Sequence, residues 1–214
     1  MSNGLLGIIF TIPAVLIAFT AQGYGKAKMA DMLGDKTPRF QGRVSLNPID
    51  HIDLMGFVMI VLVGFGWTKP IDTNPNAYKR GYKDVMKVTL AGPIANLFVG
   101  FIGAFIFMFF ANIFWGIIPE SPYMVAYSML KAIVQVNISL FIFNLLPLPG
   151  LAGFDIMKSL WPKTFYKMAD TIYQYQMFIL IAVVIGGKYI LGIPVSIIYN
   201  LFMNIARMIV NIFI

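Results

Sequence analysis

The sequence predicts an all-α integral membrane bundle, and three observations support this fold class. Of the 214 residues, 59% are hydrophobic and only 12% are charged, whereas a soluble domain carries about 25% charged residues. The mean hydropathy is +0.79. Several apolar segments also reach the length of about 20 residues that a membrane-spanning helix needs. We therefore expect a single membrane domain, residues 1–214, with about five transmembrane helices.

The spans follow one another along the chain with polar segments between them. Residues 4–25 form the first predicted span, and Pro13 is expected to kink it. Residues 85–118 and 124–146 form the next two, and residues 171–191 and 195–214 form two C-terminal helices. Between the first two spans, residues 39–46 partly alternate between apolar and polar, which predicts a small β element.

One further apolar segment, residues 54–67, is too short for a span at about 14 residues. Basic residues flank it on both sides, among them Arg43 before it and Lys69 after it. Loops rich in Lys and Arg stay in the cytoplasm, so a spanning segment here would place one basic loop outside. We therefore expect a re-entrant or interfacial segment. The loop around Glu120 has no Lys or Arg and is expected on the outer side.

The last predicted helix carries a regular polar pattern. Asn200, Asn204, Arg207 and Asn211 recur at spacings of four, three and four residues, which places them on one helical face. The simplest interpretation is a stripe that packs inward or lies at the membrane interface. A partner-binding surface is the alternative interpretation.

Composition also excludes several classes of function. There is no cysteine, so neither a disulfide framework nor a Cys-ligated metal is possible. The net charge of +7 comes from basic residues between apolar segments, which indicates membrane topology and contact with anionic lipid. Because no basic patch is interleaved with aromatic residues, we expect no nucleic-acid binding. The sequence contains no G-x-S-x-G and no phosphate-binding loop.

An ordered set of short blocks points to a family. The blocks are Leu33-Gly34-Asp35, Leu46-Asn47-Pro48-Ile49-Asp50-His51-Ile52-Asp53, Gly64-Phe65-Gly66-Trp67-Thr68-Lys69-Pro70, Leu90-Ala91-Gly92-Pro93-Ile94-Ala95-Asn96, and Phe143-Asn144-Leu145-Leu146-Pro147-Leu148-Pro149. In this order they resemble the site-2 protease family, whose members are membrane-embedded zinc metalloproteases that cut transmembrane substrates. The resemblance implies a three-helix core, here the first three spans, with the reaction centre near the cytoplasmic side.

The residues that perform the family's chemistry are replaced in this chain. The family has H-E-x-x-H on its first core helix, where two His bind zinc and the Glu is the general base. Alignment on Leu33-Gly34-Asp35 places Gln22, Gly23 and Lys26 at these three positions. The family's third ligand is the Asp of a Leu-Asp-Gly turn, and Ala152 stands there. We therefore expect no zinc, no other cofactor and no catalytic residues of the family type.

Other residues remain candidates for a cleft or a metal site. Asn137 and Asn144 are seven residues apart and share a helical face. The resemblance places such asparagines at the cleft, and hydrogen bonds between helices are the alternative role. Lys26 is a third cleft candidate, which either points inward as a strut to the turn after the third span or reaches the membrane interface. The His51 segment, Asp50-His51-Ile52-Asp53, is expected to be structural rather than a metal site.

We expect a catalytically inactive site-2 protease-like protein that binds or regulates a transmembrane segment or a partner protease. Its expected partners are the lipid bilayer and a transmembrane helix of another protein. Its expected location is a bacterial cell membrane, with the degenerate site toward the cytoplasm. Two alternatives stay open at this point. One is an active metalloprotease with unusual ligands, and the other is a small-solute transporter or channel, supported by Lys26, Lys131 and the intramembrane amides.

Overall fold

The computed structural model describes residues 5–63 and 66–213, and within these ranges the chain forms helices and loops without a β-strand. The helices in chain order are α1 (Leu5–Met32), α2 (Thr37–Phe40), η1 (Pro48–Asp50), α3 (Leu54–Val63), η2 (Pro75–Ala77), α4 (Tyr82–Ile113), α5 (Glu120–Asn144), α6 (Ala152–Leu160), α7 (Pro162–Ile190) and α8 (Gly192–Phe213). The η elements are short 3-10 helices. The all-α prediction is confirmed.

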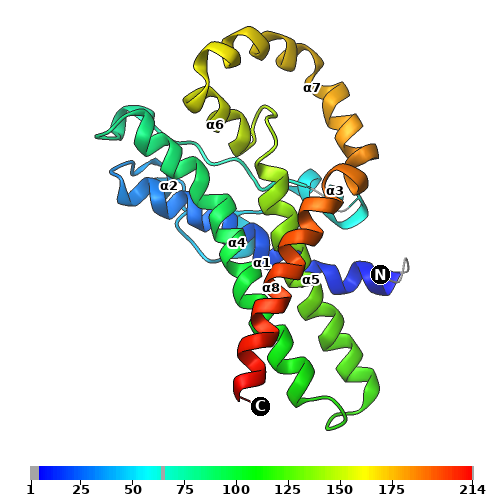
Figure 1. The fold of residues 1–214 in the computed structure, drawn as a ribbon. Coiled ribbons are helices and arrows are strands. Elements are labelled where there is room, and N and C mark those ends of the chain that lie inside the picture. The colour runs from blue at the N-terminus through cyan, green and yellow to red at the C-terminus, as the bar shows by residue number, and fades with distance from the viewer. Residues whose placement is uncertain (1–4, 64–65, 214) are drawn as a thin grey trace.

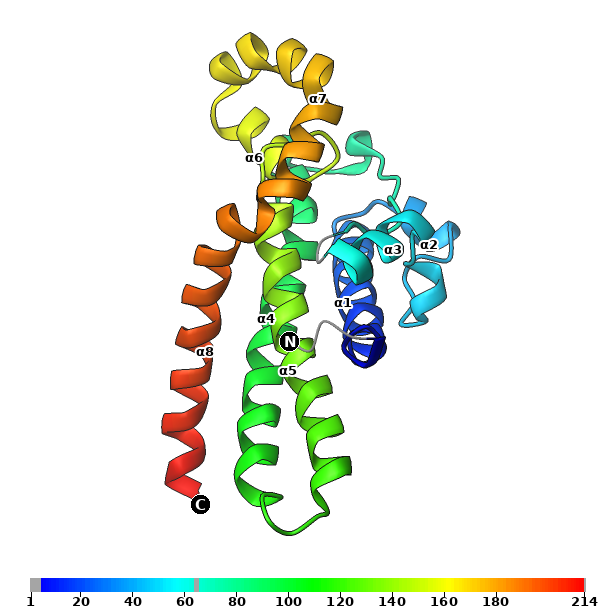
Figure 2. The ribbon, with the colours of Figure 1, turned by 90° about the vertical axis from the view of Figure 1, so that its right-hand side faces the viewer.

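Helices α4 and α5 form a long antiparallel hairpin, and α8 runs beside it (Figures 1 and 2). Helix α1 crosses this hairpin at a steep angle (Figure 1). The three helices α1, α4 and α5 make the most extensive contacts with one another. Helices α6 and α7 form an arch at the end of the bundle opposite the α4–α5 connection (Figure 1).

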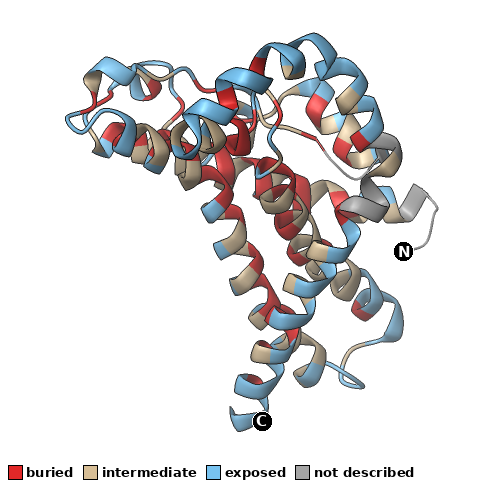
Figure 3. Ribbon diagram, turned by 45° about the horizontal axis from the view of Figure 1, so that its top comes forward, coloured by how far each residue is buried: buried red, intermediate tan, exposed pale blue. Residues whose placement is uncertain are grey.

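Small residues allow the core helices to approach closely. A Cβ atom added at Gly25 of α1 would lie 2.8 Å from Ala95 Cβ of α4, and one at Gly92 of α4 would lie 3.1 Å from Gln22 Cγ. Gly100 of α4 faces Ile138 of α5 at 3.3 Å in the same way. Glycines on α4 thus permit close packing of the core helices. Figure 3 shows buried residues gathered where these helices meet.

Four helices of the described chain are long and apolar enough to cross a membrane, namely α1, α4, α5 and α8. The sequence predicted about five, so the exact number of spans is not supported. The difference is α7, which covers the predicted span at residues 171–191 but does not qualify on its described residues. Lys163, Lys167 and Asp170 lie in the part of α7 that precedes this predicted span.

The small β element predicted at residues 39–46 is wrong. Residues 37–40 form the short helix α2 instead, and Pro38 lies in its first turn, where proline is favoured. Gly42 then reverses the chain with a φ of +70°. The Arg43 side chain donates hydrogen bonds to the backbone carbonyls of Lys69 and Pro70, so it joins this segment to another loop through a side chain rather than through strand pairing.

The short apolar segment forms α3, a helix of 10 residues. At 1.5 Å per residue it extends about 15 Å, which is half of the bilayer core. Residues 64 and 65 of the predicted segment lie outside the described residues. Ile60 of α3 is buried with Phe19 of α1 and Leu140 of α5. The helix therefore packs against the core as a short segment, and its re-entrant or interfacial placement stays a prediction.

Candidate functional site

A cavity of about 560 Å³ is lined by residues of α1, α4, α5, α6 and α7. Gln22, Gly23 and Lys26 line it from α1, and Ala152 lines it from the start of α6. These are the four positions that sequence alignment assigned to the family's chemistry. The structure thus brings two distant segments together around one space. The other lining residues are residues 67–71, Thr89, Gly92, Pro93, Phe143, Asn144, residues 148–151, Asp155, Gln176, Met177 and Leu180.

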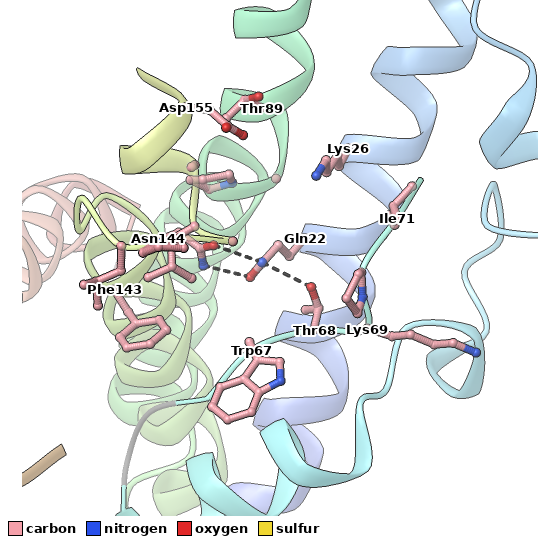
Figure 4. A pocket seen from close by; sticks show the side chains of 18 of the residues that line it. Gln22, Lys26, Trp67, Thr68, Lys69, Ile71, Thr89, Phe143, Asn144 and Asp155 are labelled. Atoms are coloured by element: carbon pink, nitrogen blue, oxygen red, sulfur yellow. Dashed lines mark hydrogen bonds between the residues drawn. The ribbon is translucent and has the colours of Figure 1, made fainter. Parts of the chain in front are cut away.

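The side chain of Gln22 joins three parts of the protein at the floor of this cavity. Its Oε1 accepts hydrogen bonds from Asn96 Nδ2 of α4 at 2.9 Å and from Asn144 Nδ2 of α5 at 3.2 Å. Its Nε2 donates to Asn144 Oδ1 and to Thr68 Oγ1, both at 3.3 Å (Figure 4). Gln22, Asn96 and Asn144 are buried, so the bonds among these three amides are shielded from water. The amide therefore holds α1, α4, α5 and the residue 67–71 loop in register.

Two side chains of opposite charge face the cavity from opposite sides. The Lys26 ammonium group points inward from α1, and the Asp155 carboxylate points inward from α6 (Figure 4). Within the described chain, neither side chain makes a hydrogen bond or an ion pair. Burial raises the pKa of Asp155, and the positive charges of Lys26 and Lys158 act in the opposite direction. Lys26 thus points inward, which is one of the two alternatives, but it forms no hydrogen bond or ion pair with the turn after α5 among the described residues.

Gly23 provides the space that the His51 ring occupies. A Cβ atom at Gly23 would lie 2.1 Å from His51 Nδ1, which is far inside van der Waals contact. His51 is fully buried, and its Nε2 donates to the Ser45 carbonyl at 2.7 Å, which fixes the tautomer. Burial lowers the pKa of His51. The single histidine therefore packs as a buried group against Gly23 of α1.

The loops around the site are fixed by two buried charged residues, Arg43 and Asp35. Arg43 donates to the carbonyls of Asp50, Lys69 and Pro70, and so links the His51 turn to the loop that carries Thr68. Asp35 accepts hydrogen bonds from the backbone N–H groups of Thr37 and Asn74 and from the Tyr78 hydroxyl. Although burial acts to raise it, these bonds hold the pKa of Asp35 below its ordinary value.

Comparison with known proteins places the chain in a family. It is 33% identical over 186 residues to a Bacillus subtilis (strain 168) protein named "Putative zinc metalloprotease YwhC", and the match covers 85% of this chain and 84% of that protein. The chain belongs to the site-2 protease family. No family model matches the chain. No solved structure matches it at a significant level.

The zinc ion that the family implies does not fit the donor groups of this cavity. Gln22 already uses both ends of its amide in hydrogen bonds. Lys26 presents an ammonium group, which repels a dication, and Ala152 presents a methyl group. Zinc sites in proteins use Cys, His and carboxylate ligands, and catalytic sites use three of them. Among the described residues, no group of three or more such side chains is placed to bind a metal.

The cleft residues expected from the sequence separate into two kinds. Asn144 and Lys26 line the cavity. Asn137 does not line it. Its side chain is fully buried beside Gly100 of α4 and donates to the Ile133 carbonyl at 2.8 Å. Sequence reasoning missed the roles of Asn96 and Thr68 as partners of Gln22, although both lie within the recognised blocks.

Proposed function

We propose that this protein is a catalytically inactive member of the site-2 protease family that binds a transmembrane segment of another protein. One observation carries the proposal. The four family positions surround a single cavity, and they hold an amide, a glycine, an ammonium group and a methyl group where the family has two imidazoles and two carboxylates. None of these replacements activates water or binds zinc at the positions concerned.

The amide network gives the cavity a role that does not need metal. In the family, zinc would bridge the first core helix and the turn after the third. Here Gln22 bridges α1 to α4 and α5 through Asn96 and Asn144. The cleft thus keeps a defined shape, with polar groups at its floor and apolar side chains such as Met177 and Leu180 at its rim. A shaped groove with a few hydrogen-bonding groups suits the binding of a transmembrane helix.

We further propose that the protein sits in a bacterial cell membrane with this cavity toward the cytoplasm. Basic residues support this orientation, because Lys36, Arg39, Lys79, Arg80 and Lys163 lie in the segments at the cavity end of the chain. The α4–α5 connection at the opposite end has no Lys or Arg. This distribution follows the positive-inside rule.

Photo-crosslinking in native membranes tests the proposal. A photoreactive amino acid replaces Met177, which lines the cavity, and in a matched variant it replaces Met168, an exposed residue of the same helix outside the cavity. We expect crosslinks to a membrane protein from position 177 only, with the partner mapped to a transmembrane segment and recovered intact. Equal capture from both positions would argue against a binding cleft. Cleavage of the captured segment by the purified protein would show an active protease.

A further inference from the structure

Helix α8 presents its polar stripe away from the bundle. Asn200, Asn204, Arg207 and Asn211 are all exposed, whereas Phe202, Met203, Ala206 and Val210 of the same helix are buried. Three of those buried residues belong to the core cluster shared with Ala104 of α4 and Ile138 of α5. The inward packing considered for this stripe from the sequence is therefore wrong. The stripe lies outside the contact between α8 and the α4–α5 hairpin.

The inner part of the stripe lies deep in the membrane. Helix α8 spans Gly192–Phe213, and it runs alongside α4 and α5 (Figure 2). At 1.5 Å per residue, Asn200 lies about 12 Å and Asn204 about 18 Å from the start of the helix. Both amides are thus near the middle of a hydrocarbon core about 30 Å thick. An amide that faces lipid at this depth has no water to replace a missing hydrogen-bond partner, so its exposure is unfavourable.

Lipid-facing residues of α8 occupy a different sector of the helix. Ile197, Leu201, Met208 and Ile212 are also exposed, and they form an apolar strip beside the polar one. The helix surface thus has a buried face, an apolar exposed strip and a polar exposed strip. A helix that met only lipid on its outer side would need no polar strip. This separation indicates that a second helix covers the polar strip.

The protein itself offers no complement to this strip. In the described chain, none of the four stripe side chains makes a hydrogen bond or an ion pair. The spanning helices contain three acidic residues. Asp31 is paired with Arg39 at 2.7 Å and Asp84 with Lys87 at 2.9 Å, and Glu120 lies at the first residue of α5. Two of these carboxylates are already paired, and Glu120 lies at the end of the bundle, so a second copy of the chain provides no unpaired carboxylate opposite Asn200 and Asn204 in the inner part of the stripe.

We propose that the polar strip of α8 binds a transmembrane helix of a different protein, one that carries a carboxylate opposite Arg207 and polar side chains opposite Asn200 and Asn204. The Arg207 guanidinium pairs with the carboxylate, which removes the cost of a lone cation within the membrane. The two amides, one helical turn apart, exchange hydrogen bonds with the partner. This surface is independent of the cavity, so the proposal does not depend on whether the protein is catalytically inactive.

Energy transfer in liposomes tests the surface with defined probes. The full-length protein, labelled with a donor dye, is reconstituted with acceptor-labelled synthetic peptides of Leu and Ala that span the bilayer. One peptide carries a Glu about six residues from one end, a second carries Lys there and a third carries Leu. We expect the Glu peptide to associate at least about fivefold more tightly than the other two. Equal association of all three peptides would overturn the proposal.

Variants assign the effect to the stripe. Arg207→Leu is expected to remove the preference for Glu over Leu. Asn204→Leu is expected to weaken severalfold the binding of a fourth peptide that also carries an Asn one helical turn from the Glu. Met208→Leu, in the apolar strip of the same helix, is the matched control and should change neither. An unchanged melting temperature of each variant shows that the fold is intact, because the stripe makes no contact with the core. Energy transfer is also measured between donor-labelled and acceptor-labelled copies of the protein. Transfer that is abolished by Asn204→Leu would indicate a homodimer and overturn the assignment.

Discussion

The substitution Gln22→Leu tests whether an amide holds the core together where the family has a metal ligand. Leucine fills a similar volume but removes hydrogen bonds to Asn96, Asn144 and Thr68. Interhelical hydrogen bonds in membrane proteins contribute about 0.6 kcal/mol each on average. The loss of three partners therefore predicts a decrease of about 2 kcal/mol in the free energy of unfolding. Part of this loss is the Asn96 amide, which is left buried without a partner.

The free energy of unfolding is measured by titrating the protein from a mild detergent into a denaturing one. Gln135→Leu is the matched control, because Gln135 lies on the spanning helix α5 and makes no side-chain hydrogen bond within the described chain. We expect this control to change the free energy by less than about 0.5 kcal/mol. A loss for Gln22→Leu that is no larger than that of the control would refute the bridging role of the amide.

Three further predictions follow from the same structure. Gly23→Ala should lower the melting temperature clearly more than Gly192→Ala, whose added Cβ meets no atom within 4 Å, and the cost should shrink in a His51→Ala background because the clash is with that ring. Burial lowers the pKa of His51 below its unfolded value near 6.5, so the neutral ring contributes stability above that pH, and this contribution is lost as the pH falls. Asp155, whose pKa burial raises, acts in the opposite direction and is therefore replaced by Asn in both test proteins. The melting temperature of the Asp155→Asn protein should fall from pH 7.5 to 5.5, whereas that of the Asp155→Asn/His51→Ala protein should not. Topology reporters at Asp35, Asn76 and Lys163 should all indicate the cytoplasm and one at Glu120 the outside, and opposite sides for Asp35 and Asn76 would show that α3 crosses the membrane.

Much of the architecture was predictable because the membrane limits the possible folds. A chain in lipid must satisfy its backbone within helices, so long apolar segments identify α1, α4, α5 and α8 directly. The short length of residues 54–67 likewise predicted the short helix α3. The β element was predicted wrongly because the alternation of apolar and polar residues over 39–46 does not show that the Arg43 side chain binds the carbonyls of Lys69 and Pro70.

The residues that form the site were predictable from the sequence, but the hydrogen bonds between them were not. The ordered blocks identified Gln22, Gly23, Lys26 and Ala152, and the structure brings them to one cavity. The sequence did not reveal that Gln22, rather than Lys26, bridges the helices. That role depends on the positions of the Asn96 and Asn144 amides relative to Gln22, which the sequence does not give. It also could not show that the space beside Gly23 is filled by His51, 28 positions along the chain.

The metal content of the purified protein tests the central claim most directly. The protein is expressed with zinc in the medium, purified in mild detergent without chelator, and its zinc is measured by mass spectrometry per mole of chain. The variant Gln22→His/Lys26→His/Ala152→Asp passes through the same steps as a matched comparison, since all three positions line one cavity. The account predicts far less than stoichiometric zinc in the natural chain and more in the variant. Stoichiometric zinc in the natural chain that survives a chelator would contradict it.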